Sequence, residues 1–200
     1  MKWILASASP RRKQLLSEFL SEFEIIPAIG EESADETLPP RELVCALARQ
    51  KAEEVAAGER AKGKVVLGAD TVVALDGEIL GKPKTRAHAK QMLSALSGRA
   101  HEVYTGVCVI LPSGERIVEA DRTLVHFNAL SEAFIDEYIK GGSPMDKAGA
   151  YGIQDGGLVE RIEGSFSNVV GFPCELFESV LKRINEGTVS AKNGGEEVEK

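Results

Sequence analysis

The longest apolar run of the sequence, Val65 to Leu75, contains a single charged residue, Asp70. Its β-branched residues favour a buried strand, and the run is far shorter than the ~20 apolar residues that a membrane-spanning helix requires. Asp76-Gly77, a dipeptide typical of tight hairpin turns, predicts that the chain reverses into a second strand over 78–80. The sheet of this protein is therefore expected to include a buried strand that carries a carboxylate in its interior.

Strand and helix patterns alternate through the rest of the chain, which predicts an α/β fold. Strands are predicted over 3–6, 23–29, 101–111 and 115–127, with a strand pair across 158–171, and helices through 15–20 and over 41–57, 87–96, 131–140 and 173–185. The hairpins favour a mixed, twisted sheet flanked by helices over a purely parallel one. The glycine-rich stretch 143–157 is expected to be an ordered loop that contacts a ligand, with one short helical turn.

The length of 200 residues is typical of one folding unit, either one large domain or two small lobes that share a cleft. We expect this unit to span 1–186. The polar and charged segment 187–200 is expected to be a disordered tail.

Composition and charge narrow the classes of partner. A formal net charge of −7 argues against binding duplex nucleic acid, because such surfaces are basic. The first residues lack the long apolar segment of a signal peptide, and the three cysteines are too far apart for a disulfide framework or a zinc site. We therefore expect a cytoplasmic protein that binds neither nucleic acid nor membrane.

The cluster Ser7-Ala8-Ser9-Pro10-Arg11-Arg12 follows the first predicted strand and begins the first predicted helix. Serine is a favoured helix cap and proline a favoured first helical residue, so both arginines are expected in the first turn. Cations are unfavourable there unless an anion is bound, because the helix dipole is positive at this end. The cluster predicts a phosphate site; the alternative is an exposed basic turn with surface ion pairs.

Charged residues also occur where apolar ones are expected. Lys51 lies on the apolar stripe of its predicted helix, either lining a cleft or extending its ammonium to the surface. Asp70 is interpreted as a metal ligand or a base, with a strand-end aspartate bonded to a neighbouring loop as the alternative. Glu31, Glu32 and Lys82 add charges on nearby loops. Together these residues suit a divalent cation and a polyphosphate.

Four motifs in this order resemble those of the Maf family of nucleoside triphosphate pyrophosphatases: Ser7-Ala8-Ser9-Pro10-Arg11-Arg12, Gly68-Ala69-Asp70-Thr71, Gly81-Lys82-Pro83 and Asp146-Lys147-Ala148-Gly149-Ala150-Tyr151-Gly152-Ile153-Gln154. The resemblance runs from about Ile4 to Leu181. It implies an elongated fold similar to that of the inosine triphosphate pyrophosphatases, with two lobes around a cleft and often a homodimer.

The resemblance also implies residue roles. Asp70 resembles the family's proton acceptor, and it would hold Mg2+ or Mn2+ together with Glu32. Positions associated with the choice of base are Arg11, Thr71 and Gln154. The remaining phosphate and metal site would be formed by Ser7, Arg12, Glu32, Lys51, Lys82, Asp146 and Lys147.

The residues at the three base-associated positions resemble the branch that acts on dTTP and UTP. The implied reaction hydrolyses the triphosphate, of ordinary or modified pyrimidine nucleotides, to a monophosphate and pyrophosphate. Housekeeping of the nucleotide pool and division arrest are the implied biological roles. A non-catalytic, nucleotide-sensing regulator of cell division is the alternative from another class, and a phosphatase or sugar-phosphate enzyme is a third reading.

Overall fold

The computed structural model describes residues 1–31, 33–35, 37–141 and 143–187. Its centre is a mixed sheet in the order β2-β1-β3-β5-β6-β7, with β4 paired to β3. The strands are β1 (Trp3–Leu5), β2 (Glu24–Ile25), β3 (Val65–Leu75), β4 (Glu78–Leu80), β5 (Ala100–Ile110), β6 (Arg116–Phe127) and β7 (Val159–Glu163). Strand β1 runs parallel to β2 and β3, and all other pairs are antiparallel. The predicted mixed sheet is confirmed.

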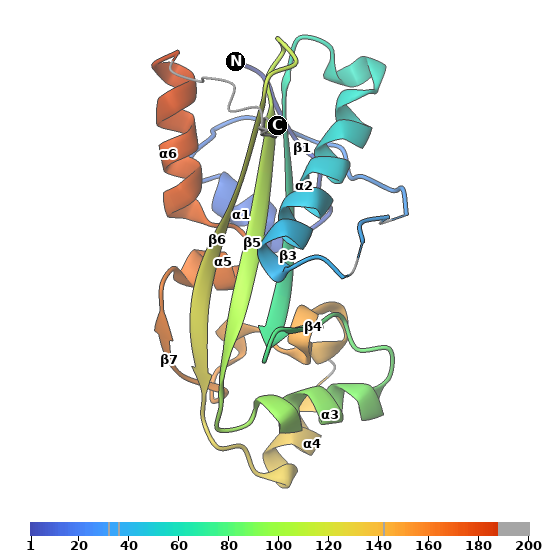
Figure 1. Ribbon diagram of the computed structural model, residues 1–200, viewed down its shortest axis with the longest axis vertical. Helices are drawn as coiled ribbons and strands as arrows, with labels where there is room; N and C mark the ends of the chain where they lie inside the picture. Colours follow the sequence, from blue (N-terminus) through green and yellow to red (C-terminus); the bar gives the residue numbers. More distant parts are fainter. Residues whose placement is uncertain (32, 36, 142, 188–200) are drawn as a thin grey trace, which may run out of the picture.

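Helices cover both faces of this sheet (Figure 1). They are α1 (Pro10–Leu16), α2 (Pro40–Ala56), α3 (Arg86–Leu96), α4 (Glu132–Lys140), α5 (Phe166–Val170) and α6 (Cys174–Asn185), with short 3-10 turns η1 (Glu59–Ala61), η2 (Ser143–Asp146), η3 (Ala148–Ala150) and η4 (Ile153–Asp155). Helices α2 and α6 lie on opposite sides of the long strands, and α3 and α4 lie at their lower end. Within the described ranges, none of these helices has both the length and the apolar character needed to cross a membrane.

The long strands β3, β5 and β6 connect two lobes (Figure 1). The upper lobe holds β1, β2, α1, α2 and α6, and the lower lobe holds β4, β7, α3, α4 and the turns η2 to η4. Because successive side chains of a strand point to opposite faces, β3 contributes Leu67 to the apolar cluster beside α1 and α6, and Val66 to the one beside α2. Farther along, Val73 joins the apolar cluster of the lower lobe. Each lobe therefore has its own apolar packing on a shared sheet.

Two glycines allow α2 to lie directly on the sheet. A Cβ atom at Gly68 would lie 2.3 Å from the carbonyl oxygen of Ala48, and one at Gly106 would lie 2.4 Å from that of Val44. Both contacts are far shorter than van der Waals distance and involve backbone, which cannot rotate away. The close approach of α2 therefore depends on the absence of side chains at these two positions.

The predicted strand pair across 158–171 is wrong in its second half. Strand β7 ends at Glu163, and helix α5 follows. Ser165 Oγ accepts a hydrogen bond from the Asn168 N–H at 3.2 Å and caps the helix, while Gly171, with φ of 116°, ends it. The β-branched residues Val169 and Val170 resembled a strand, but this local capping and the burial of Asn168 decide for a helix.

Two other expectations differ in extent. The predicted strand over 23–29 is reduced to Glu24–Ile25, and the loop 143–157 contains three 3-10 turns where one helical turn was expected. Of the predicted tail, residues 188–200 lie outside the described part of the chain.

Candidate active site

A cleft of about 1250 Å3 opens between the lobes. Residues from both lobes line it, and they include all the predicted site residues except Glu32: Ser7, Arg11, Arg12, Lys51, Asp70, Thr71, Lys82, Asp146, Lys147 and Gln154. Glu32, predicted as a metal ligand, lies outside the described residues. The structure thus brings together side chains that are up to about three quarters of the chain apart in sequence.

The cleft lies along the edge of β3. Strand β1 pairs with β3 as far as Leu67, and β4 pairs with the same edge only from Val73 onward. Within the described residues, 68–72 therefore have no strand beside them on that edge. Side chains from both faces of β3 reach the cleft through this gap, which explains why the neighbours Asp70 and Thr71 both line it.

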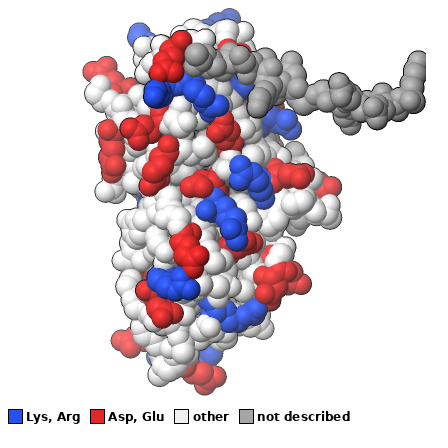
Figure 2. Space-filling view, turned by 60° about the vertical axis from the view of Figure 1, so that its left-hand side comes forward, with Lys and Arg blue, Asp and Glu red and all other residues white. Residues whose placement is uncertain are grey.

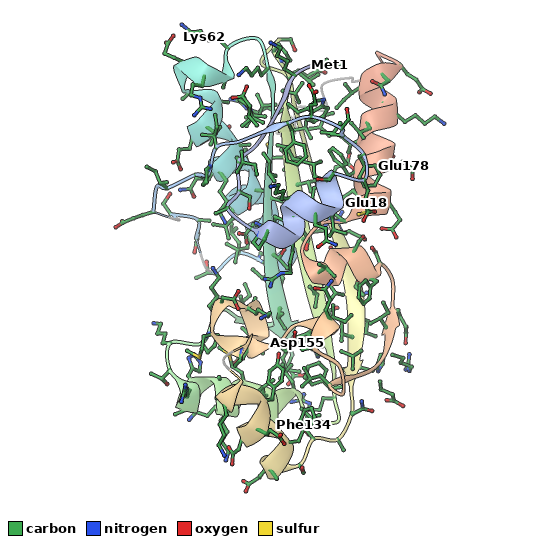
Figure 3. All side chains as sticks on the ribbon, turned by 180° about the vertical axis from the view of Figure 1, so that it is seen from behind. Met1, Glu18, Lys62, Phe134, Asp155 and Glu178 are labelled. Carbon is green, nitrogen blue, oxygen red and sulfur yellow. The ribbon has the colours of Figure 1, made fainter. Side chains whose placement is uncertain are left out.

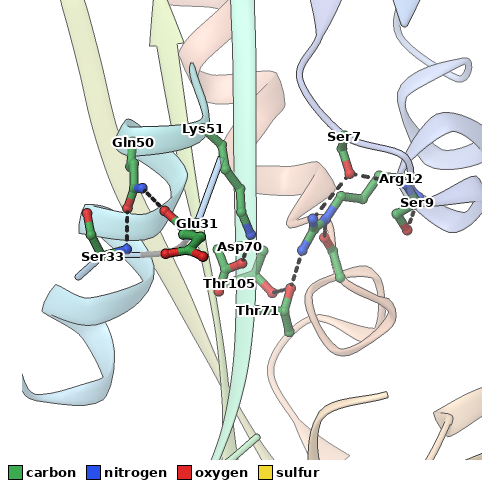
Figure 4. Close-up of polar contacts among 11 residues, drawn as sticks. Ser7, Ser9, Arg12, Glu31, Ser33, Gln50, Lys51, Asp70, Thr71 and Thr105 are labelled. Atoms are coloured by element: carbon green, nitrogen blue, oxygen red, sulfur yellow. Dashed lines mark hydrogen bonds and ion pairs between the residues drawn. The ribbon is translucent and has the colours of Figure 1, made fainter. Parts of the chain in front are cut away.

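Asp70 forms an ion pair with Lys51 at the floor of the cleft (Figure 4). Asp70 points to the face covered by α2, is only 8% exposed, and lies opposite Gly106 in the β3–β5 ladder. Lys51 projects from α2, whose close approach over the glycines brings its ammonium to the carboxylate. Its partner is thus a cleft carboxylate, and its side chain is only 19% exposed.

Arg12 is held on the opposite face of β3 by three side-chain hydrogen bonds (Figure 4). Its Nε donates to Gly171 O at 2.9 Å, its Nη1 to Ser7 Oγ at 3.3 Å and its Nη2 to Thr71 Oγ1 at 3.1 Å. The predicted helix start is confirmed, with Ser9 as cap accepting from the Arg12 N–H at 3.4 Å. Because every nitrogen of the guanidinium is bonded, its plane is fixed relative to the cleft.

The rim of the cleft carries further charged and polar side chains. Arg11 Nη1 lies 3.9 Å and Lys147 Nζ 3.1 Å from carboxylate oxygens of Asp146. Partial burial raises the pKa of Asp146, but the hydrogen bond and charge of Lys147, with Arg11, outweigh it, so its pKa lies below the ordinary value. Lys82 and Gln154 are exposed on the lower-lobe side. On the face shown in Figure 2, acidic and basic side chains are also interspersed.

Several supporting residues had no signal in the sequence. On the lower lobe, the Tyr138 hydroxyl donates to Asp155 and accepts from the Gly152 N–H at 3.1 Å, which ties down the turn that carries Gln154. Figure 3 shows Asp155 in the lower lobe, above Phe134. On α2, Gln50 accepts from the Ser33 N–H and donates to the Glu31 carbonyl. These contacts join distant segments, so no local pattern could have identified them.

A buried histidine supports the wall of the cleft. His101 shares a hydrogen bond of 2.7 Å between its Nε2 and the hydroxyl of Tyr151, a residue that lines the cleft. Phe127 packs edge-on against both rings. Burial, with a smaller contribution from the charge of His126, lowers the pKa of His101 to about 4. His101 is therefore neutral in the folded protein at neutral pH.

Acid is expected to destabilise the protein through His101. In the unfolded chain its pKa is near 6.5, so below that pH the imidazole of the unfolded state binds a proton. In the folded state His101 stays neutral down to about pH 4. The contribution of neutral His101 to the free energy of unfolding is therefore complete above pH 6.5. It is lost as the pH falls toward 4, by about 3 kcal/mol in total. Chemical denaturation of wild type and His101→Phe from pH 7.5 to 4 measures it. The difference in unfolding free energy between wild type and His101→Phe should change across this pH range. If the two proteins lose stability in parallel, His101 is not the group responsible.

The chain is similar to known proteins over almost all of its described length. The family described as Maf-like protein matches residues 2–184. A protein named dTTP/UTP pyrophosphatase from Thermococcus gammatolerans is 49% identical, covering 86% of this chain and 91% of its own length. A protein of the same name from Bacillus cytotoxicus is 45% identical, covering 95% of this chain and 99% of its own.

Solved structures support the fold. The Staphylococcus aureus Ham1 protein superimposes with a TM-score of 0.51 at 16% identity, covering 94% of this chain and 100% of its own. A HAM1 protein from Coxiella burnetii gives the same TM-score and identity, covering 92% and 99%. At this identity the likeness concerns the arrangement of the elements alone, and it agrees with the predicted α/β fold, a mixed sheet flanked by helices.

Proposed function

Since this chain belongs to the Maf-like protein family, we propose that it hydrolyses dTTP and UTP to the nucleoside monophosphate and pyrophosphate. The observation that carries the proposal is the composition of the cleft, where cations from both lobes line the same space as one buried carboxylate, Asp70. These cations are Arg11, Arg12, Lys51, Lys82 and Lys147. A polyanion the size of a triphosphate complements this charge, and the similarity of the relatives over most of the chain supports a pyrimidine nucleotide.

The two sides of β3 support different tasks. Arg12, fixed by three hydrogen bonds, presents a planar donor group that suits phosphate oxygens. Lys51 and Lys82 approach from α2 and the lower lobe as point charges. Asp70, buried and paired with Lys51, is the carboxylate in position to orient a water molecule and accept its proton as that water attacks the α-phosphorus. Charge developing on the phosphate oxygens would be stabilised by the surrounding cations.

The oxygen donors of the cleft are compatible with a divalent cation. Mg2+ commonly uses one or two protein carboxylates and completes its shell with substrate phosphates and water. Within the described part of the chain, no group of three or more His, Cys, Asp or Glu residues gathers as a dedicated site. Asp70 would therefore hold Mg2+ or Mn2+ together with the triphosphate and with Glu32 as the second carboxylate. The metal would supply charge neutralisation and a lowered pKa of bound water.

Base choice is assigned to the rim. Gln154, on the turn secured by Tyr138 and Asp155, offers both a donor and an acceptor, which matches the imide edge of thymine or uracil. Modified pyrimidine nucleotides that keep this edge are included in the proposed substrates. Housekeeping of the nucleotide pool, a link to division arrest and a homodimer follow from the family resemblance and stay predictions.

A product screen tests the proposal. Purified protein is expected to release pyrophosphate and the monophosphate from dTTP and UTP in the presence of Mg2+ or Mn2+, with slower turnover of dCTP, ATP and GTP, and chelation should stop the reaction. Orthophosphate as the first product would contradict attack at the α-phosphorus. Calorimetric binding of dTTP without any product would instead favour a nucleotide-sensing regulator.

A further inference from the structure

Two threonines on adjacent strands lie side by side beneath the cleft. Thr71 of β3 and Thr105 of β5 are directly paired in the antiparallel ladder, and their hydroxyl oxygens are 3.0 Å apart. Thr71 reaches the cleft, whereas Thr105 is fully buried, with 0% exposure. The Thr105 hydroxyl also contacts the carbonyl oxygen of Asn168 in α5, at 2.9 Å. Thr105 thus connects Thr71, which reaches the cleft, to helix α5.

The direction of each hydrogen bond in this chain follows from the groups at its two ends. A carbonyl oxygen only accepts, so the single hydroxyl hydrogen of Thr105 is committed to Asn168 O. The bond between the two hydroxyls must then be donated by Thr71. A guanidinium only donates, so the remaining contact runs from Arg12 Nη2 to Thr71 Oγ1, at 3.1 Å. All three hydrogen bonds therefore point the same way, from Arg12 through both hydroxyls to Asn168 O.

This polarity makes Thr71 an acceptor for Arg12. Its hydrogen is directed toward Thr105, which leaves its lone pairs facing the guanidinium. Without an acceptor at 105, the Thr71 hydroxyl is free to rotate, and its lone pairs are no longer held toward Nη2. Arg12 would then keep its ties to Gly171 O and Ser7 Oγ but lose the third point that defines its plane.

We propose that Thr105 is a positioning residue of the anion site, which orients Arg12 through Thr71 for binding the triphosphate. The inference rests on the proposed function and deepens it. It also gives Thr71 a different role from the one implied by the family resemblance. A hydroxyl that orients the phosphate-binding arginine affects the triphosphate shared by every nucleotide, not the base.

The first test replaces Thr105 by Val, which keeps the shape and removes the hydroxyl. The Asn168 carbonyl keeps the Gly171 N–H as a second donor at 3.0 Å, so one of its bonds survives. Calorimetry with inorganic tripolyphosphate should show Kd raised about tenfold, the loss expected of one hydrogen bond. KM should rise similarly for dTTP and dCTP with kcat little changed, and Thr105→Ser should restore wild-type values. Thr71→Val breaks the same chain and should give the same loss, even where Thr105→Val folds poorly.

A double substitution separates positioning from a general structural role. Thr105→Val is expected to add no further loss of tripolyphosphate affinity in an Arg12→Gln background, whereas general damage would lower affinity in both backgrounds. Ser97→Ala is the matched control, because it removes a hydroxyl that accepts from the Leu130 N–H at 2.7 Å in the lower lobe. It should lower Tm without changing Kd.

The outcomes distinguish the two proposals. Wild-type affinity in Thr105→Val, with weakened binding in Arg12→Gln, would overturn the positioning role and leave the proposed function intact. Wild-type affinity in Arg12→Gln would overturn both the positioning role and the use of Arg12 as a phosphate ligand. Release of no pyrophosphate by the wild type, with tripolyphosphate binding that still depends on Thr105, would overturn the proposed reaction alone.

Discussion

Substitution of Asp70 by Asn is expected to lower kcat for pyrophosphate release about 100- to 10,000-fold, the range that positioned acid–base groups contribute. The amide has nearly the shape of the carboxylate and still accepts a hydrogen bond from Lys51, so the fold should persist. It carries no negative charge and cannot accept a proton from water or hold a cation well. Steady-state kinetics with dTTP, with Tm measured in parallel, tests this expectation.

Asp76→Asn provides a matched control for Asp70→Asn. Asp76 lies in the β3–β4 turn with φ of 54°, and its carboxylate pairs with the exposed Arg99. Asparagine tolerates this left-handed conformation well, so the effect on stability should stay within roughly 1 kcal/mol, and kcat should be unchanged. Near-wild-type kcat in Asp70→Asn would remove Asp70 from its proposed role.

Substitution of Gly106 by Ala is expected to destabilise the protein by about 3 kcal/mol or more. The added Cβ would lie 2.4 Å from the carbonyl oxygen of Val44 and 2.9 Å from the backbone nitrogen of Cys45, so α2 itself must shift. For a chain of this size such a loss lowers Tm by roughly 6–12 °C. Displacement of α2 also withdraws Lys51 from Asp70, so kcat for hydrolysis by the folded protein should fall.

Thermal unfolding and kinetics of Gly106→Ala are best compared with those of Gly114→Ala. Gly114 lies in the turn between β5 and β6, where an added Cβ meets nothing within 4 Å, although its φ of 88° makes any side chain strained. That strain costs only about 1–2 kcal/mol and lies far from the cleft, so Tm should fall less and kcat should not change. A Gly106→Ala variant with unaltered Tm and kcat would refute the packing argument.

Residues with strong local preferences were predicted correctly. The strand over Val65–Leu75 and its Asp76-Gly77 turn match the structure, as does the helix start at Ser9 and Pro10. In each case neighbours in sequence decide the conformation, through side-chain branching, a cap or a left-handed turn. The prediction for the segment after β7 was wrong because local preferences conflicted there. The cap at Ser165 outweighed the strand preference of the β-branched residues that follow it.

The candidate site shows the same division. Two charged residues, Asp70 within an apolar strand and Lys51 on an apolar helical stripe, were unusual without any structure. The family motifs contained the other predicted residues that line the cleft. Tyr138, His101 and Thr105 gave no such signal, because a buried polar residue is recognisable only by the partner it meets. Those partners come from elements that are distant in sequence.

The sequence alone determined the strands and helices whose local preferences are strong, and which charged residues have to find compensation for being buried. Only the tertiary structure decided that Thr71 faces Thr105, that α2 rests on Gly68 and Gly106, and that Lys51 therefore meets Asp70. The reason is physical: a local preference depends on residues a few positions apart, whereas strand register and helix docking depend on shape and burial across the whole sheet, and a shift of one residue would turn every side chain of a strand to the other face.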